Sequence, residues 1–265
     1  MPEPTTYPPG ALCWADLLAP EPAAAERFYA DVLGWEYVHA GAAFDDYAYA
    51  THARHMVAGI AGGEADAEGF WVVAFATDRA DALAERIVAA GGEVIDGPRD
   101  FGIQGRSLVA VDAAGAHVGF WQPRAHLGAG LVGAPGALCW AELAVRDVAA
   151  ADAFYHAVLG LRAGAHAAAG SPDYAAYLLD GATPGDAGGG VPVAGRTVLG
   201  PEASGVEPFW MPYFGVTDAA GTAALATDRG ATLRHLGADA TGRGLAVLSD
   251  PWGATFAVLE LAPGT

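Results

Sequence analysis

Two carboxylates stand inside short apolar segments that are near copies of each other. Asp16 lies in PGALCWADL, and Glu142 lies in PGALCWAEL, 126 positions further on. A carboxylate in apolar surroundings is costly to desolvate unless it is hydrogen-bonded or paired, and burial raises its pKa. We therefore take both as candidate catalytic residues, each a general base for proton transfer. The alternative is a structural carboxylate bonded to Arg106, Arg243 or backbone amides.

Three further polar side chains are candidates for the same chemistry. His117 is a candidate acid or base on the last strand predicted for the first half, the alternative being a structural histidine. Arg106 and Arg243 each follow a glycine at the start of corresponding strands. They could clamp a carbonyl or phenolate oxygen of a ligand, or simply pair with Asp or Glu.

Aromatic residues surround the candidate carboxylates in the predicted strands. Side chains two positions apart in a strand point to the same face, so Trp14 accompanies Asp16 and Trp140 accompanies Glu142. An aromatic wall with few polar groups is typical of a pocket for a bulky, partly planar ligand, the alternative being an ordinary core. The residues expected to bind ligand, with the two arginines, are Trp14, Trp140, Tyr47, Tyr49, Trp121, Met211 and Tyr213.

Composition narrows the partners and the chemistry. The 265-residue chain has a formal net charge of −18, which argues against nucleic acid and anionic membranes as partners. Lysine is absent, so a lysine Schiff base and the usual anchoring of pyridoxal phosphate are excluded. Neither a secretory signal nor an apolar run of 18 residues occurs, which predicts a soluble cytoplasmic protein. Cys13 and Cys139 are predicted to be two buried thiols.

The duplication predicts two halves of similar fold. FYxxVLG ends a predicted helix at Gly34 and again at Gly160. We expect residues 1–125 and 135–265 to be two halves of similar fold, joined by a glycine-rich linker at 126–134. An insertion at 181–205 is expected to be a flexible loop. Each half reads as two strand-helix-strand-strand-strand modules, with helices at Glu21–Leu33, Arg79–Ala90, Val148–Leu159 and Ala219–Asp228.

These modules resemble the vicinal oxygen chelate superfamily, which includes glyoxalases, bleomycin-resistance proteins and extradiol dioxygenases. The resemblance lies in FYxxVLG and in the turns DAAG at 112–115 and DPWG at 250–253, each before a final strand. The fused two-half arrangement is similar to an actinobacterial hydroxylase-like branch. The resemblance implies an α+β fold, with four tandem βαβββ modules forming two open β-barrels that are flanked by helices and hold a ligand in their hollows.

Many members of this superfamily bind one divalent metal in the hollow. The resemblance places the ligand positions at Trp14, Val72 and Gly119 in the first half, and at Trp140, Met211 and Ala257 in the second. None of these offers the nitrogen or oxygen that such metals prefer, and a thioether is too soft. We therefore expect no metal and no cofactor.

The function expected from these features is metal-independent binding of an aromatic or polyketide-like secondary metabolite. The same pocket could transform the compound by cofactor-free acid–base chemistry, such as cyclisation, isomerisation, dehydration or a hydroxylation-assisting step. The alternatives are a passive drug-sequestering resistance protein, a metal-dependent lyase or dioxygenase, and an interaction protein with a vestigial pocket. His117, which Thr255 replaces in the second half, favours the first half for chemistry. A monomer or a homodimer is expected.

Overall fold

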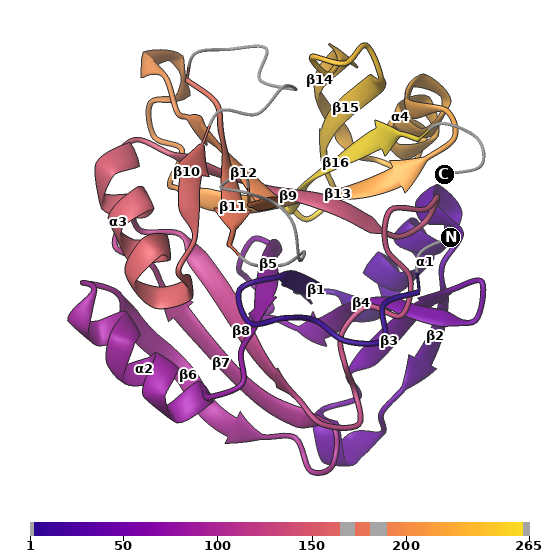
Figure 1. The fold of residues 1–265 in the computed structure, drawn as a ribbon. Helices are drawn as coiled ribbons and strands as arrows, with labels where there is room; N and C mark the ends of the chain where they lie inside the picture. Colours follow the sequence, from indigo (N-terminus) through magenta and orange to yellow (C-terminus); the bar gives the residue numbers. More distant parts are fainter. Residues whose placement is uncertain (1–2, 165–172, 181–189, 262–265) are drawn as a thin grey trace.

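The chain folds into two open eight-stranded sheets, one from each half (Figure 1). The structure is a computed structural model that describes residues 3–164, 173–180 and 190–261. In the described residues no helix is long and apolar enough to cross a membrane. The predicted α+β fold of two tandem βαβββ-type halves is confirmed.

The four predicted helices occur within one residue of their expected bounds. The first half contains β1 (Leu12–Ala19), α1 (Pro22–Leu33), β2 (Glu36–His39), β3 (Ala48–His52), β4 (His55–Gly62), β5 (Phe70–Ala76), α2 (Ala80–Ala89), β6 (Glu93–Asp100), β7 (Gly105–Val111) and β8 (His117–Pro123). The second half contains β9 (Leu138–Val145), α3 (Val148–Leu159), β10 (Arg162–Gly164), β11 (Ala175–Leu179), β12 (Val191–Val198), β13 (Phe209–Val216), α4 (Ala219–Asp228), β14 (Thr232–Ala238), β15 (Gly244–Ser249) and β16 (Thr255–Glu260).

The strand order shows which modules pair. The first sheet runs β2-β3-β4-β1-β5-β8-β7-β6, and the second runs β10-β11-β12-β9-β13-β16-β15-β14. In each sheet the first strands of the two modules are antiparallel neighbours, with Asp16 opposite Val72 and Glu142 opposite Met211. The modules therefore pair within a half, a point on which the sequence was silent.

The FYxxVLG motif forms a helix end and a core contact. Gly34 ends α1 in the left-handed conformation, with φ of 71°, which glycine adopts without strain. Phe28 and Tyr29 lie on the buried face of this helix. Gly160 ends α3 in the same way, with φ of 72°. The motif is therefore explained by helix capping and packing.

A hydrogen-bond chain ties α1 of the first half to the last turn of the second half. The buried Tyr29 hydroxyl donates to Asp250 Oδ2 at 3.0 Å and accepts from Trp71 Nε1 at 3.2 Å. Asp250 also accepts the amide hydrogens of Trp252 and Ala254 in its own turn. The polar groups in this buried region therefore satisfy one another.

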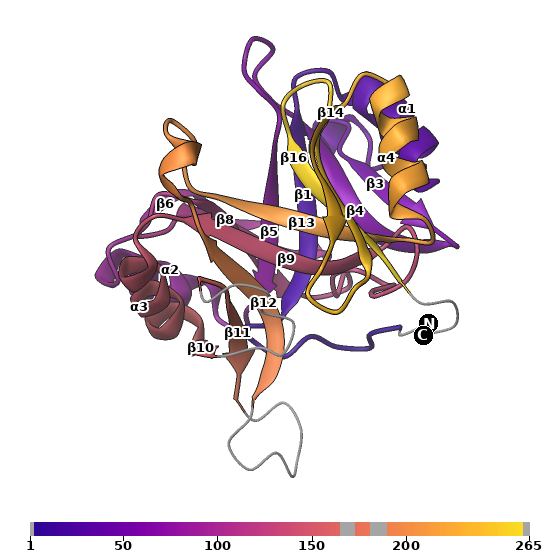
Figure 2. The same ribbon diagram turned by 90° about the horizontal axis from the view of Figure 1, so that it is seen from above.

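The reciprocal chain joins α3 of the second half to a turn of the first. Tyr155 donates to Asp112 Oδ2 at 2.7 Å and accepts from Trp210 Nε1 at 2.7 Å. Figure 2 shows the matching packing of helices, with α1 beside α4 and α2 beside α3. The superfamily-like signature residues thus join the two halves and do not face the hollows.

The segment 126–134 is packed against the first half along part of its length. The Ala129 amide donates to the Cys13 carbonyl at 2.8 Å, and the Tyr7 hydroxyl donates to the Ala129 carbonyl at 2.7 Å. Leu131 is fully buried. The link between the halves therefore also contributes to the structure around β1.

The expectation of a flexible loop over 181–205 is wrong in its second part, where the sequence also predicts a short strand at Val191–Val193. Residues 191–198 form β12, which lies between β11 and β9 in the second sheet. Ala194 and Gly195 are the buried residues of this strand, and its glycine and proline content obscured the strand in the sequence. Residues 181–189 lie outside the described residues.

Candidate ligand-binding site

The concave side of the first sheet holds a pocket of 330 Å³ around Asp16. The pocket is framed by β1, by the ends of β2 and β3, and by β8 with the start of the linking segment. Its lining is mostly aromatic and apolar. The lining residues are Trp14, Asp16, Val38, His39, Ala40, Phe44, Tyr47, Tyr49, Met56, Phe101, Gln104, Ser107, Trp121 and His126.

Asp16 is held by two neutral donors on the same oxygen. Trp14 Nε1 donates to Asp16 Oδ1 at 2.9 Å, and the Tyr47 hydroxyl donates to that oxygen at 2.5 Å. In the described residues, Oδ2 has no hydrogen-bond partner and is not enclosed by protein. The arrangement fixes the carboxyl group and leaves one oxygen for a ligand. The expected structural partners, an arginine or backbone amides, are not what binds Asp16.

A glycine makes this arrangement fit. Gly59 on β4 lies opposite Asp16, and a Cβ atom there would overlap the Tyr47 hydroxyl and Asp16 Oδ1. The absent side chain lets Tyr47 reach across the sheet to the carboxylate. Gly195 on β12 repeats this role opposite Glu142, where a Cβ atom would overlap the Tyr174 hydroxyl.

Aromatic rings form steeply angled walls around the carboxylate. The ring centroids of Trp14 and His126 are 4.6 Å apart at 85°, and those of Tyr47 and Tyr49 are 4.9 Å apart at 77°. Trp121 contacts His126 and donates its Nε1 hydrogen to the His126 carbonyl at 2.7 Å. Edge-to-face contacts of this kind are favourable and hold the rings in place.

Burial sets the charges inside this pocket. Burial raises the pKa of Asp16, while the hydrogen bonds from Tyr47 and Trp14 act in the opposite direction. Burial lowers the pKa of His126 to about 4, so this imidazole is neutral at neutral pH. The only other histidine of the lining, His39, lies 3.3 Å from Glu26. The neutral His126 ring therefore adds no positive charge to balance the carboxyl group of Asp16 in this pocket.

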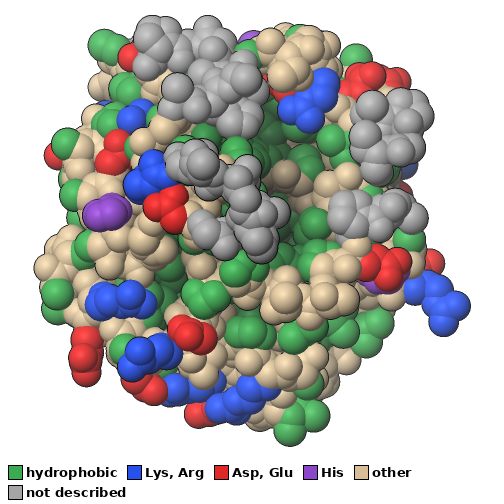
Figure 3. Space-filling view, viewed as in Figure 1, with side chains coloured by type: hydrophobic (Ala, Val, Ile, Leu, Met, Phe, Trp, Pro, Cys, Tyr) green, Lys and Arg blue, Asp and Glu red, His purple; other side chains and the backbone are tan. Residues whose placement is uncertain are grey.

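The second sheet holds a corresponding pocket of 470 Å³ around Glu142. Figure 3 shows hydrophobic side chains around a hollow in the upper centre of this face, over the second half. Trp140 Nε1 donates to the Tyr174 hydroxyl at 3.1 Å, as Trp14 Nε1 does to Tyr47 at 3.1 Å. Glu142 accepts a hydrogen bond from the Tyr213 hydroxyl at 3.2 Å.

The polar groups of the second pocket differ in charge from those of the first. Arg243 lines it and is paired with Asp239 at 2.6 Å between Nη2 and Oδ2. Burial raises the pKa of Glu142 from 4.5 to about 7, only partly offset by the hydrogen bond from Tyr213. A carboxyl group with this pKa can both accept and donate a proton near neutral pH.

His117 lies apart from both carboxylates. It lines a cross-half groove of 240 Å³ together with Phe70, Glu207 and Thr255. Its ring is exposed, with its centroid 5.2 Å from that of Phe70. Although His117 and Trp121 are on the same face of β8, His117 begins the strand and Trp121 lies four residues further along it. The geometry therefore brings His117 together with its counterpart Thr255, and not with Asp16.

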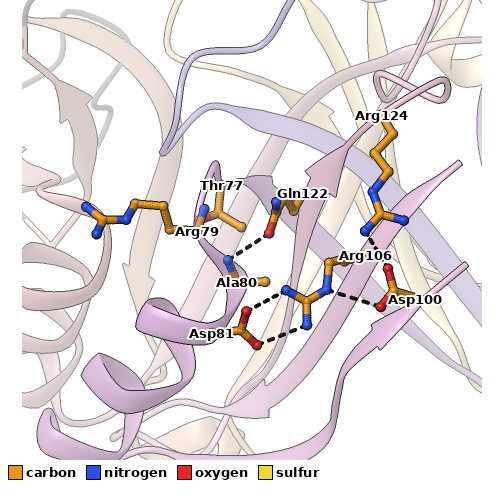
Figure 4. A network of polar contacts seen from close by, with 8 residues as sticks. All are labelled: Thr77, Arg79, Ala80, Asp81, Asp100, Arg106, Gln122 and Arg124. Atoms are coloured by element: carbon orange, nitrogen blue, oxygen red, sulfur yellow. Dashed lines mark hydrogen bonds and ion pairs between the residues drawn. The ribbon is translucent and has the colours of Figure 1, made fainter. Parts of the chain in front are cut away.

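Arg106 is paired on the surface and lines neither carboxylate pocket. Figure 4 shows it between two acidic groups, with both guanidinium Nη atoms bonded to Asp81 at 2.6 and 2.9 Å. Its Nε lies 3.7 Å from Asp100, which also pairs with Arg124. Of the two alternatives that the sequence leaves open, pairing with Asp is the one observed for both Arg106 and Arg243.

The remaining expected site residues divide between the two pockets. Trp14, Tyr47, Tyr49 and Trp121 line the first, whereas Trp140 and Tyr213 line the second. Met211 is buried beside Tyr213 in the apolar layer of the second half. The two thiols are free: each of Cys13 and Cys139 donates to a backbone carbonyl on the neighbouring strand at 3.3 Å.

Sequence reasoning missed four contributors to these pockets. His126 was assigned to a linker, because glycine in the residues after it suggested a connection only. The sequence analysis assigns no role to Tyr174, although its hydroxyl corresponds to that of Tyr47. Phe44 and Phe101 lie in separate modules, with stacked rings 6.5 Å apart. One clue was available in the sequence: Tyr174 follows Trp140 at nearly the same spacing as Tyr47 follows Trp14.

The positions at which the superfamily binds a metal do not fit one here. In the first half they are occupied by Trp14, Val72 and Gly119. The Trp14 nitrogen is a donor already bonded to Asp16, and a Cβ atom at Gly119 would lie 3.2 Å from Val72 Cγ1. None of these three residues offers a side-chain lone pair to a divalent ion. Among the described residues, no three His, Cys, Asp or Glu side chains are grouped to hold a metal.

The chain belongs to the Glyoxalase/Bleomycin resistance protein/Dioxygenase superfamily, whose sequence pattern matches residues 12–120. It is 34% identical over 276 residues to the anthracycline biosynthesis protein DnrV of Streptomyces peucetius, covering 98% of this chain and 96% of DnrV. It is 36% identical over 272 residues to the protein CFP32 of Mycobacterium tuberculosis (strain CDC 1551 / Oshkosh), covering 99% of each.

The fold is shared with solved structures of lower sequence identity. The Mn(II)-bound glyoxalase from Novosphingobium aromaticivorans superimposes with a TM-score of 0.64 at 17% identity, covering 95% of this chain and 82% of that protein. This likeness supports the fold alone. It does not carry over the metal, because the corresponding positions lack metal-binding side chains.

Proposed function

We propose that the protein binds an aromatic or polyketide-like secondary metabolite in the first-half pocket, and that it does so without a metal ion. The observation that carries this proposal is the half-buried carboxyl group of Asp16, fixed through one oxygen and surrounded by aromatic rings. The cavity is apolar enough to bind a planar ring system, and Asp16 Oδ2 supplies a single strong acceptor. The similarity to DnrV, which is named for anthracycline biosynthesis, supports a role in secondary metabolism.

A second candidate function is cofactor-free proton transfer at Glu142 in the second pocket. It is favoured by the pKa of that carboxyl group, near 7, and by the adjacent Tyr213 hydroxyl at 3.2 Å. In this function Glu142 removes a proton from the bound compound and returns it at another position, so no redox partner is needed. A passive, sequestering protein would instead release its compound unchanged.

Mass spectrometry distinguishes these functions. The purified protein is incubated with an organic extract of the source organism, and both the re-isolated protein and the spent extract are analysed. A compound retained unchanged indicates a binder. A consumed compound with a new mass or isomer, formed without added metal or nicotinamide, indicates an enzyme. The Glu142→Gln variant then loses turnover by about 10²–10⁴-fold while it keeps binding.

A variant that tests the first-half pocket uses the natural difference between the halves. Trp121 occupies the position that Leu259 holds in the second half. Gly119 pairs with Ala74 on β5 as Ala257 pairs with Tyr213 on β13, and Trp121 and Leu259 each lie two residues further along the last strand. The Trp121→Leu variant thus gives the first half a residue that the fold already tolerates. It should lose retention of the compound. Equal retention by this variant would place the compound outside the first-half pocket and would contradict the proposal.

A further inference from the structure

The carboxyl group of Asp16 is provided with hydrogen bonds but with no counter-charge. Its two donors, the Trp14 indole and the Tyr47 hydroxyl, are neutral, and both act on Oδ1. In contrast, the described acidic groups paired to arginine, such as Asp81, Asp152 and Asp239, lie on the surface or outside the first pocket. A half-buried carboxylate without a cation is poorly stabilised, and a bound cation would remedy this.

The described lining of the first pocket supplies no unpaired cation for Asp16. Its lining contains no arginine among the described residues, and the chain contains no lysine. His126 is a buried neutral ring, and His39 lies 3.3 Å from Glu26. An anionic ligand would therefore meet a carboxylate and no unpaired cation in the described lining. The overall formal charge of −18 also favours the approach of cations over anions.

The walls of the pocket are suited to a cation as well. Trp14, Tyr47, Tyr49 and Trp121 surround the space near Asp16, and their rings meet at steep angles. The faces of indole and phenol rings attract cations electrostatically, and cages of such rings recognise organic ammonium groups. A carboxylate and several electron-rich rings in one cavity form a combined site for a positive charge attached to an apolar body.

We propose that the compound taken up by the first-half pocket carries a protonated amine, whose ammonium group lies against Asp16 Oδ2 and the surrounding aromatic rings. This inference rests on the proposed function, because it specifies the class of compound bound in that same pocket. The planar body of the compound then packs toward Phe44 and Phe101, further out along the cavity. In the second pocket Arg243 is already paired with Asp239, and Glu142 is bonded to Tyr213 with a pKa of about 7, so that carboxyl group is a weaker site for a cation.

The test uses three probes with one ring system and different charges: 2-naphthylmethylammonium, 2-naphthylmethanol and 2-naphthoate. Their dissociation constants are measured at pH 7.5 by calorimetry and by tryptophan fluorescence. The ammonium probe should bind at least about tenfold more tightly than the alcohol, since a charge-assisted bond is about 1.4 kcal/mol better than a neutral one. The naphthoate should bind most weakly. Equal affinities for ammonium and alcohol in the unaltered protein would overturn the inference.

Variants assign the preference to Asp16. In Asp16→Asn the ammonium probe should fall to the affinity of the alcohol, whose own affinity changes little. Glu142→Gln, the matched change in the second half, should leave the preference intact. A preference that persists in a folded Asp16→Asn protein contradicts the inference. If Asp16→Asn does not fold, the three-probe comparison in the unaltered protein still decides the question.

Failure of the inference and failure of the proposed function give different results. If the alcohol binds and Trp121→Leu weakens it, the pocket accepts aromatic compounds, and only the preference for an amine is then in question. If no probe binds at millimolar concentration, or if Trp121→Leu affects none of them, the first-half pocket is not the binding site. The amine inference is then overturned together with the proposed function.

Discussion

The two pockets are built on one scaffold around different polar centres. In both, a tryptophan on the first strand donates to a tyrosine hydroxyl at 3.1 Å, and a glycine on the neighbouring strand makes room for that tyrosine. The carboxyl group two residues after the tryptophan differs by one methylene. Asp16 stays within reach of Trp14 and Tyr47, whereas Glu142 is bonded to Tyr213.

The neighbours of each carboxyl group explain why the partners differ. Tyr213 lies opposite Trp140, at the position where Ala74 lies opposite Trp14. The first half thus has no hydroxyl on β5 for its carboxyl group, and it retains space there. Trp121 and His126 add aromatic surface to the first pocket, whereas Leu259 and Arg243 line the second. A duplicated framework therefore supports two chemically distinct cavities.

The largest effect is expected from filling the space that the glycines leave. The added methyl group in Gly59→Ala would overlap Tyr47 and Asp16, so Tyr47 must move. We expect loss of measurable naphthyl-probe binding, and a fall of about 3 kcal/mol in the free energy of unfolding, at the upper end for overpacking. Calorimetry and denaturant unfolding measure both. Gly195→Ala is the matched control: it should destabilise the second half and leave probe binding unchanged.

The reciprocal chains between the halves should contribute equally to stability. Tyr29→Phe removes the donor to Asp250, and Tyr155→Phe removes the donor to Asp112. Each should lower the free energy of unfolding by about 1–2 kcal/mol, because each aspartate keeps backbone donors while a buried indole loses its acceptor. Denaturant unfolding measures this. A loss in one variant only would show that the interface is not symmetric in energy.

The charge of Glu142 should appear in the pH dependence of stability. Burial raises its pKa from 4.5 to about 7 in the folded protein, so the folded state binds this proton more tightly than the unfolded chain does. The stabilising contribution is complete below about pH 4.5 and is lost as the pH rises through about 7. The melting temperature of the native protein, minus that of Glu142→Gln at the same pH, should therefore fall as the pH rises over that range.

The control for this pH dependence is Glu93→Gln, which changes an exposed carboxyl group on β6. The difference between it and the native protein should stay nearly constant over the same range. Asp16→Asn should give a slope of the same sign as Glu142→Gln, since burial raises the pKa of Asp16 as well. If the native protein instead gains stability relative to Glu142→Gln as the pH rises, burial does not raise the pKa of Glu142 and this account of its charge is wrong.

The smallest effect is expected from removing one hydroxyl from each pocket. Tyr47→Phe removes one of the two donors to Asp16, and a single hydrogen bond is worth about 1 kcal/mol. The affinity for 2-naphthylmethylammonium, measured by calorimetry, should therefore fall about fivefold. Tyr174→Phe removes the corresponding hydroxyl of the second half and should leave this affinity unchanged. Equal effects from both variants would mean that the probe does not distinguish the pockets.

The comparison between halves also shows how far the sequence could predict the site. The repeat aligned Trp14 with Trp140 and Asp16 with Glu142, and strand alternation placed each pair on one face. The same alternation placed His117 on the face of Trp121, yet strand length carries it into a different groove. Arg106 follows glycine as Arg243 does, but only Arg243 lines a carboxylate pocket, because the acidic neighbours of Arg106 lie on the surface.

The sequence by itself determined the modules, their duplication, and the residue types available to each hollow. These follow from local periodicity, capping glycines and the repeat, which require no knowledge of distant contacts. Only the tertiary structure decided that modules pair within a half and that the signature tyrosines bond across halves. It also decided that His126 closes the first pocket and that Asp16 receives neutral donors only. These features depend on long-range strand order and on gaps left by single glycines, which sequence periodicity does not encode.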